Sequence, residues 1–232
     1  MSTLTLALPS KGRLMEETLA RFAAAGLSIV RDGTDRGYKG HVASLPEIAV
    51  AFLSASEIAA FLKSGRVHLG VTGEDLVAEA VGPGDPRIAL VHRLGFGRAD
   101  VVVAVPACWL DVDRMADVEQ VAPAFRAVHG RHLLVATKYR SLTRRYFAER
   151  LVTSYRIVES LGATEGAPAA GHAEIIVDIT STGETLRANH LKILADGVIL
   201  KSEAAVFASA AAAWSPEGSR LRVLVRDRLA KG

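Results

Sequence analysis

The chain of 232 residues is half apolar and has one cysteine, Cys108, which excludes an internal disulfide and is typical of a reducing compartment. Its 28 basic and 25 acidic residues give a net charge of +3 without any basic run. This argues against a nucleic-acid binder and is compatible with anionic small-molecule partners. Because no signal peptide and no run of membrane-spanning length are found, we expect a cytoplasmic protein.

The first predicted element is a strand over residues 4–8, where leucines alternate with smaller residues. Pro9 ends it, and a turn containing Lys11, Gly12 and Arg13 leads into a helix. Two cations on a strand-to-helix turn are placed where a pyrophosphate or triphosphate can bind, Arg13 through its fork and Lys11 as a point charge. Taken alone, the turn is better explained by two solvated surface cations.

A polar stretch over residues 31–36, which includes Arg31, is interpreted as a loop. An apolar strand over residues 48–53 follows. The next helix opens with Ser54 and Glu57 spaced as a capping box and ends near Gly65.

A third strand is predicted over residues 67–71 and leads into a turn with Gly73 and Asp75, which opens another helix. Strand, turn and helix units repeated in this order predict an α/β fold with a mostly parallel sheet. In such folds ligands bind at the carboxyl ends of the strands.

The segment GPGDPR at residues 82–87 separates this region from a second alternation of strands and helices. Strands are expected over residues 101–105, 133–136 and 155–158, with an acidic, exposed segment at 111–119 and a basic helix within 137–147. Glu165 follows in a Gly- and Ala-rich context. Its carboxylate is either a hydrogen-bond acceptor for ribose hydroxyls or a surface acid.

The most informative stretch is EIIVDITSTGETLRAN at residues 174–189, a buried strand with Asp178 near its carboxyl end. A turn rich in hydroxyls and glycine follows it and opens a helix, which suits a phosphate dianion. The candidate binding residues of this turn are Ser181, Thr182, Gly183, Glu184 and Thr185. From the pattern alone, an ordinary turn capped by Ser or Thr is about as well supported.

After an apolar segment at residues 197–208, an Ala-rich stretch runs through Trp214. Ser215 and Pro216 interrupt it, and a short basic tail ends at Gly232. We expect no further domain in this part of the chain.

With these segments in place, the chain resembles the ATP phosphoribosyltransferase family, in its short form, over nearly its whole length. The motifs that carry the resemblance are LALPSKGRL, LGVTGEDL, LLVATKYRSLTRRYF, IVESLGATEGAP and EIIVDITSTGETLRAN. The last, with its acid-x-x-x-[ST]-G-x-T arrangement, is the most specific. Many relatives carry an arginine where this chain has Ser54, and Pro-Asn where it has Arg140 and Ser141.

The resemblance implies transfer of a phosphoribosyl group from phosphoribosyl pyrophosphate to N1 of ATP, the first step of histidine biosynthesis, with Mg²⁺ accompanying the substrates. It implies a 5-phosphate site at the turn that follows Asp178, and ribose contacts from Asp178 and Glu165. Lys11, Gly12 and Arg13 would lie by the pyrophosphate or the ATP phosphates, and Gly73 and Asp75 would border the nucleotide. Arg31 would have to take the role of the arginine absent at Ser54.

The implied fold is a two-lobed, periplasmic-binding-protein-like α/β fold with mostly parallel or mixed sheets and a cleft. Residues 1–95 and 181–232 would form the first lobe, and residues 96–180 the second. The implied partners are a regulatory subunit resembling histidyl-tRNA synthetase and a second catalytic chain. Two alternatives stay open: a cytoplasmic solute-binding or sensor module, and a phosphoribosyltransferase that uses a free base.

Overall fold

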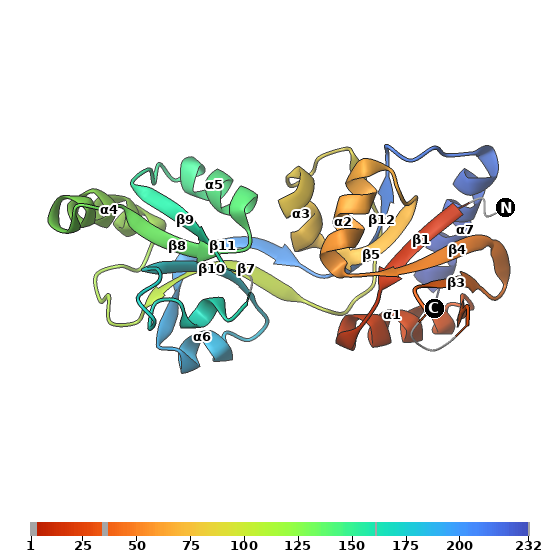
Figure 1. Ribbon diagram of the computed structural model, residues 1–232, viewed down its shortest axis with the longest axis horizontal. Coiled ribbons are helices and arrows are strands. Elements are labelled where there is room, and N and C mark those ends of the chain that lie inside the picture. The colour runs from red at the N-terminus through yellow and green to blue at the C-terminus, as the bar shows by residue number, and fades with distance from the viewer. Residues whose placement is uncertain (1–3, 34–36, 161, 232) are drawn as a thin grey trace. The chain divides into compact units, whose positions relative to one another are not determined.

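The computed structural model describes residues 4–33, 37–160 and 162–231. They divide into two units, the first made of residues up to Arg98 and from Glu203 onward, and the second of Ala99–Ser202. The chain therefore passes twice between the units, at 98/99 and at 202/203 (Figure 1). The second crossing lies about twenty residues later than predicted, because residues 191–202 pair with the sheet of the second unit.

The first unit contains a seven-stranded sheet in the order β2-β3-β4-β1-β5-β12-β6. Its strands are β1 Leu4–Pro9, β2 Ile29–Arg31, β3 Lys39–Val42, β4 Leu45–Leu53, β5 Leu69–Gly73, β6 Ile88–Arg93 and β12 Ala204–Ser209. β1 runs parallel to both β4 and β5, whereas β12 is antiparallel to β5. The predicted loop at residues 31–36 is wrong at its start, since Arg31 ends β2; residues 34–36 lie outside the described residues.

Two pairs of helices cover the two faces of this sheet (Figure 1). They are α1 Gly12–Ala24 and α7 Pro216–Lys231 on one face, and α2 Ala55–Ser64 and α3 Glu74–Val81 on the other. Alternation along β1 explains this, because Leu6 packs with α1 and α7, and Ala7 with α2. The capping box of α2 and its end at Gly65 are confirmed.

The C-terminal segment is a helix rather than the predicted short basic tail. In α7, Leu221, Val225 and Leu229 are buried in the core of the first unit. Because several arginines lie between these apolar residues, the segment has a basic composition that does not indicate a buried helix. Pro216 begins the helix, a position at which proline is favoured because it has no N–H to leave unpaired.

The second unit contains a five-stranded sheet in the order β11-β7-β10-β8-β9. Its strands are β7 Ala99–Pro106, β8 Leu133–Thr137, β9 Tyr155–Glu159, β10 Ile175–Thr180 and β11 Leu191–Ser202; its helices are α4 Met115–His129, α5 Arg140–Glu149, α6 Glu184–Ala188 and the 3-10 turn η1 Thr164–Gly166. In the segment 111–119, Asp111, Asp113 and Glu119 are exposed, as predicted, but the segment enters α4, where Met115 and Val118 are buried.

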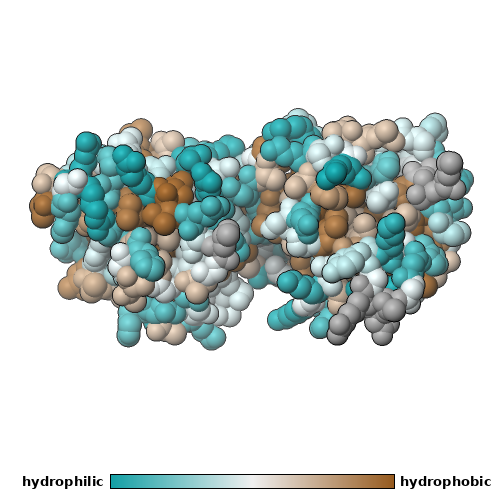
Figure 2. Space-filling view, viewed as in Figure 1, coloured by the Kyte–Doolittle hydropathy of each residue, from teal (hydrophilic) through white to brown (hydrophobic). Residues whose placement is uncertain are grey.

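Within the second unit, β8 is parallel to both β9 and β10, so the carboxyl ends of these three strands meet at one edge. β7 is antiparallel to β10. On the face of the molecule in Figure 2, polar and charged side chains predominate on both units and apolar atoms appear in small patches. The apolar residues of the strands are instead buried in the cores of the two units.

Candidate functional site

The residues predicted to form a site fall into two groups, one in each unit. In the second unit, Glu165, Asp178, Ser181, Thr182 and Thr185 line one cavity of about 270 Å³. Ile179, Thr180 and Leu186 complete its lining. The structure thus brings together the acid of η1, the acid of β10 and the hydroxyl-rich turn.

The turn after β10 is organised by its own hydroxyl groups. The N–H of Gly183 donates to Thr180 Oγ1 over 2.9 Å, and the N–H of Glu184 donates to Thr182 Oγ1 over 3.3 Å. Gly183 has a φ of +72°, which an L side chain adopts only with strain. Gly183 and Glu184, both described by the structure, do not line the cavity.

Asp178 is the acid of this cavity whose pKa is shifted. Burial raises the pKa of Asp178, the charge of Glu165 adds to the rise, and the N–H of Ile179 and the charge of Lys138 oppose it. The Ile179 N–H donates to Asp178 Oδ1 over 2.8 Å. A desolvated carboxylate next to a second acid is a strong acceptor for sugar hydroxyls and stabilises developing positive charge.

The second group lies in the first unit, where the ends of β1, β4 and β5 meet. Lys11 is the N-cap of α1, Gly12 is its first residue with a φ of +72°, and both are exposed. The side chain of Arg13 is 85% exposed and pairs with Glu17 over 2.9 Å.

Arg31 lies at the same edge of the sheet. β2 and β4 are both antiparallel to β3 and therefore run in the same direction, and Arg31 is the last residue of β2. Its Nη1 donates to the carbonyl of Gly37 over 3.1 Å, and its Nη2 lies 3.1 Å from Met15 Sδ of α1. Ser54 has a structural role, since its hydroxyl accepts from the N–H of Glu57 as the cap of α2.

The turn between β5 and α3 carries the other two predicted residues. Gly73 is the N-cap of α3, and Asp75 in the first helical turn is only 5% exposed. A carboxylate at this position is stabilised by the helix dipole. The contact of Gly73 and Asp75 with a nucleotide stays a prediction.

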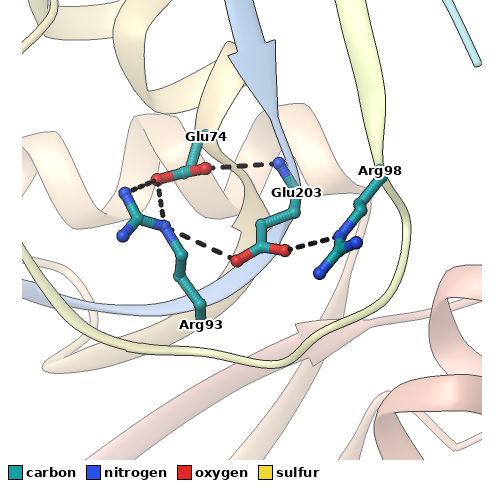
Figure 3. A network of polar contacts seen from close by, with 4 residues as sticks. All are labelled: Glu74, Arg93, Arg98 and Glu203. Atoms are coloured by element: carbon teal, nitrogen blue, oxygen red, sulfur yellow. Dashed lines mark hydrogen bonds and ion pairs between the residues drawn. The ribbon is translucent and has the colours of Figure 1, made fainter.

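An ion network anchors this turn, and sequence reasoning missed it (Figure 3). Arg93 donates twice to Glu74 Oε1, over 3.0 and 2.8 Å, and the N–H of Glu203 donates to Glu74 Oε2 over 3.3 Å. The carboxylate of Glu203 in turn pairs with Arg98 over 3.3 Å. The start of α3 is therefore tied to the residues at which the chain leaves and re-enters the first unit.

Among the described residues, no group of three or more His, Cys, Asp or Glu side chains is arranged to hold a metal ion. A single carboxylate together with substrate phosphates is, however, a donor set that suits Mg²⁺, which usually keeps several waters. The described residues also contain no helix long and apolar enough to cross a membrane.

The fold places the chain in the class of two-lobed α/β proteins that also contains periplasmic binding proteins. A periplasmic binding protein of Brucella ovis with glutathione bound matches 98% of this chain and 66% of its own, with a TM-score of 0.51 and 10% identity. The ATP phosphoribosyl transferase (HisG:HisZ) complex of Thermotoga maritima matches 98% of this chain and 96% of its own, with a TM-score of 0.72 and 25% identity.

Residues 54–227 match the family model of ATP phosphoribosyltransferase. An ATP phosphoribosyltransferase of Rhodopseudomonas palustris is 56% identical over 97% of this chain, which spans 69% of that relative. One of Sinorhizobium medicae is 60% identical over 87% of this chain and 88% of the relative. The chain belongs to the ATP phosphoribosyltransferase family of transferases.

Proposed function

We propose that this chain transfers the phosphoribosyl group of phosphoribosyl pyrophosphate to N1 of ATP, the first step of histidine biosynthesis. The observation that carries the proposal is the cavity in which Asp178 and Glu165 meet a hydroxyl-rich turn, in a chain of this family. In the reaction, N1 forms a bond to C1 of the ribose. The bond from C1 to the pyrophosphate oxygen breaks, and its electron pair leaves with pyrophosphate.

The site supplies charge and position rather than a nucleophile. The ring nitrogen already has a free lone pair, so no activating base is needed. Ionised Asp178 and Glu165 would stabilise the positive charge that develops on the ribose, and they would hold its hydroxyls. Ser181, Thr182 and Thr185 would bind the 5-phosphate. Holding two substrates in line can supply roughly 7 to 11 kcal/mol of the barrier.

The cations of the first unit would bind the phosphates that extend beyond the sugar. Lys11 and Arg13 are exposed on one turn, and Arg31 approaches the same helix through Met15. Asp178 would help to hold Mg²⁺ that accompanies the substrate phosphates, and the ion would supply positive charge for the leaving group. Gly73 and Asp75 would border the nucleotide.

We further propose that the chain assembles with a regulatory subunit resembling histidyl-tRNA synthetase and with a second catalytic chain. The support is the likeness to the Thermotoga maritima protein, whose structure is that of a HisG:HisZ complex. Feedback inhibition by histidine would then require the partner.

The test is to incubate the chain with ATP, phosphoribosyl pyrophosphate and Mg²⁺ and to follow pyrophosphate release. Release that requires all three supports the proposal. Release with adenine or orotate in place of ATP would indicate a transferase for free bases. Binding of either substrate without any turnover would indicate a sensor module.

A further inference from the structure

Lys138 follows the last residue of β8 and is a cation beside the cavity of the second unit. In the parallel pair of β8 and β10, Thr137 is opposite Val177. The next residues along the two strands are Lys138 and Asp178. Neighbouring strands lie about 4.8 Å apart, so the ammonium group is within reach of the space that Asp178 faces.

Hydrogen bonds fix the backbone on either side of Lys138. Thr137 Oγ1 accepts the N–H of Tyr139 over 2.8 Å, and the carbonyl of Thr137 accepts the N–H of Ser160 over 3.2 Å. The carbonyl of Tyr139 accepts the hydroxyl of Thr143 over 2.6 Å. The ring of Tyr139 is buried, and Lys138 Nζ lies 5.0 Å from its centroid. This framework fixes the backbone on either side of Lys138, whose own side chain is exposed and free to meet a ligand.

Lys138 has no carboxylate within 4.0 Å in the described part of the chain, unlike Lys192, whose Nζ pairs with Asp113 over 2.7 Å. Its charge acts instead on the cavity, where it opposes the rise in the pKa of Asp178 that burial and Glu165 produce. Two acids alone would repel a donor that carries several phosphate charges. One cation at the rim reduces that repulsion.

The sheet order puts Lys138 and the phosphate turn on opposite sides of Asp178. The turn after β10 leads to α6, which packs toward β11 through the cluster containing Leu186 and Leu191. β8 lies on the other flank of β10. In phosphoribosyl pyrophosphate the ribose likewise separates the 5-phosphate from the pyrophosphate on C1.

We propose that Lys138 binds the pyrophosphate group of the donor while the turn at Ser181–Thr185 holds the 5-phosphate. This inference rests on the proposed function. It assigns the second unit a share in binding the leaving group, which the sequence assigned only to cations of the first unit.

The test compares the variants Lys138→Gln and Lys138→Arg with a control, Arg144→Gln, which removes an exposed cation from α5. Binding of inorganic pyrophosphate and of ribose 5-phosphate is measured by calorimetry with Mg²⁺ present. We expect Lys138→Gln to weaken pyrophosphate binding about ten- to hundredfold, as loss of a charged hydrogen bond predicts. Binding of ribose 5-phosphate should stay within about twofold, Lys138→Arg should restore most of the loss, and the control should match wild type.

Kinetics supply a second readout, because KM for the donor should rise far more than KM for ATP. Unchanged pyrophosphate binding in Lys138→Gln overturns the inference. Weakened ribose 5-phosphate binding with unchanged pyrophosphate binding also overturns it. A wild-type chain that releases no pyrophosphate from its substrates overturns the proposed function instead.

Discussion

The guanidinium of Arg31 lies against the ring of Phe52, with its central carbon 3.8 Å from the ring centroid. Phe52 is fully buried in β4, so the ring is a fixed platform. A stacked guanidinium keeps its planar fork oriented, which suits bidentate binding of phosphate. This relationship fits Arg31 to the phosphate-binding role that the resemblance to the family implies for it.

The first prediction tests Arg31 through Arg31→Lys, which keeps the charge but removes the fork and the stacking. We expect pyrophosphate release to slow about ten- to hundredfold, because a charged hydrogen bond contributes roughly 1.5 to 3 kcal/mol. The control is Arg66→Lys, since Arg66 lies over Phe61 in the same unit at 4.7 Å and has no proposed role in binding. Wild-type rates in Arg31→Lys and in Arg31→Ala would show that Arg31 only packs.

The second prediction concerns Gly183, whose φ of +72° is matched by a φ of +69° at Gly171 in the same unit. Alanine at either position should cost about 1 kcal/mol of unfolding free energy, because an L side chain is strained there. At Gly183 the added Cβ would also lie 3.1 Å from Arg187 Nη1, whereas at Gly171 it would meet open space. Arg187 Nη1 is the end of a flexible side chain and can move aside, so the difference between the two variants is expected in binding. Only Gly183 lies between Thr182 and Thr185, which line the cavity, so only Gly183→Ala should raise KM for phosphoribosyl pyrophosphate more than KM for ATP.

Urea unfolding and steady-state kinetics of both alanine variants check this prediction. Equal kinetic effects of Gly183→Ala and Gly171→Ala would mean that the turn after β10 does not bind the 5-phosphate.

The third prediction follows from the raised pKa of Asp178, whose main cause is burial. A carboxyl group with a folded pKa above its unfolded value holds its proton more tightly when folded, so unfolding free energy falls as pH rises through the two values. Asp178→Asn should therefore raise the Tm at pH 7 and slow turnover severely. The gain in Tm should shrink as pH falls through the raised folded pKa of Asp178 and should be gone below about 3.9, where the wild-type carboxyl is protonated in both states.

Asp117 provides a control, because its pKa is shifted in the opposite direction from that of Asp178. The N–H groups of Asp113 and Arg114, which donate to its carboxylate over 2.9 and 2.8 Å, lower the pKa of Asp117. Asp117→Asn should lower the Tm at pH 7 without affecting turnover, and its effect should also fade in acid. Thermal scans from pH 3 to pH 8 compare the two variants. A lower Tm for Asp178→Asn at pH 7 would contradict the burial argument.

The fourth prediction concerns regulation. If histidine acts through a partner subunit, the isolated chain should bind histidine weakly, and inhibition should appear only when the partner is added. The coupling must be reciprocal, so bound substrates should weaken histidine binding to the assembly by the same factor. Titrating histidine against the activity of the chain alone checks this. Strong inhibition there would place the effector site within these residues.

Much of this protein could be predicted from its sequence because the signals are local. The capping box at Ser54 and Glu57 depends on residues three apart, and the end of α2 at Gly65 depends on one left-handed residue. The cavity turn after Asp178 was likewise predictable, since the strand, the acid and the hydroxyls are contiguous. The motifs then indicated the family that the comparisons establish.

What the tertiary structure decided depends on strand order and on contacts between distant residues. The second crossing moved to 202/203 because β11 pairs with β7, about ninety positions earlier in the chain. α7 exists as a buried helix because the core of the first unit receives its leucines. The sequence alone does not distinguish Lys138 from other surface cations. Its place next to Asp178 follows from the pairing of β8 with β10, and a linear pattern does not give the register between strands forty residues apart.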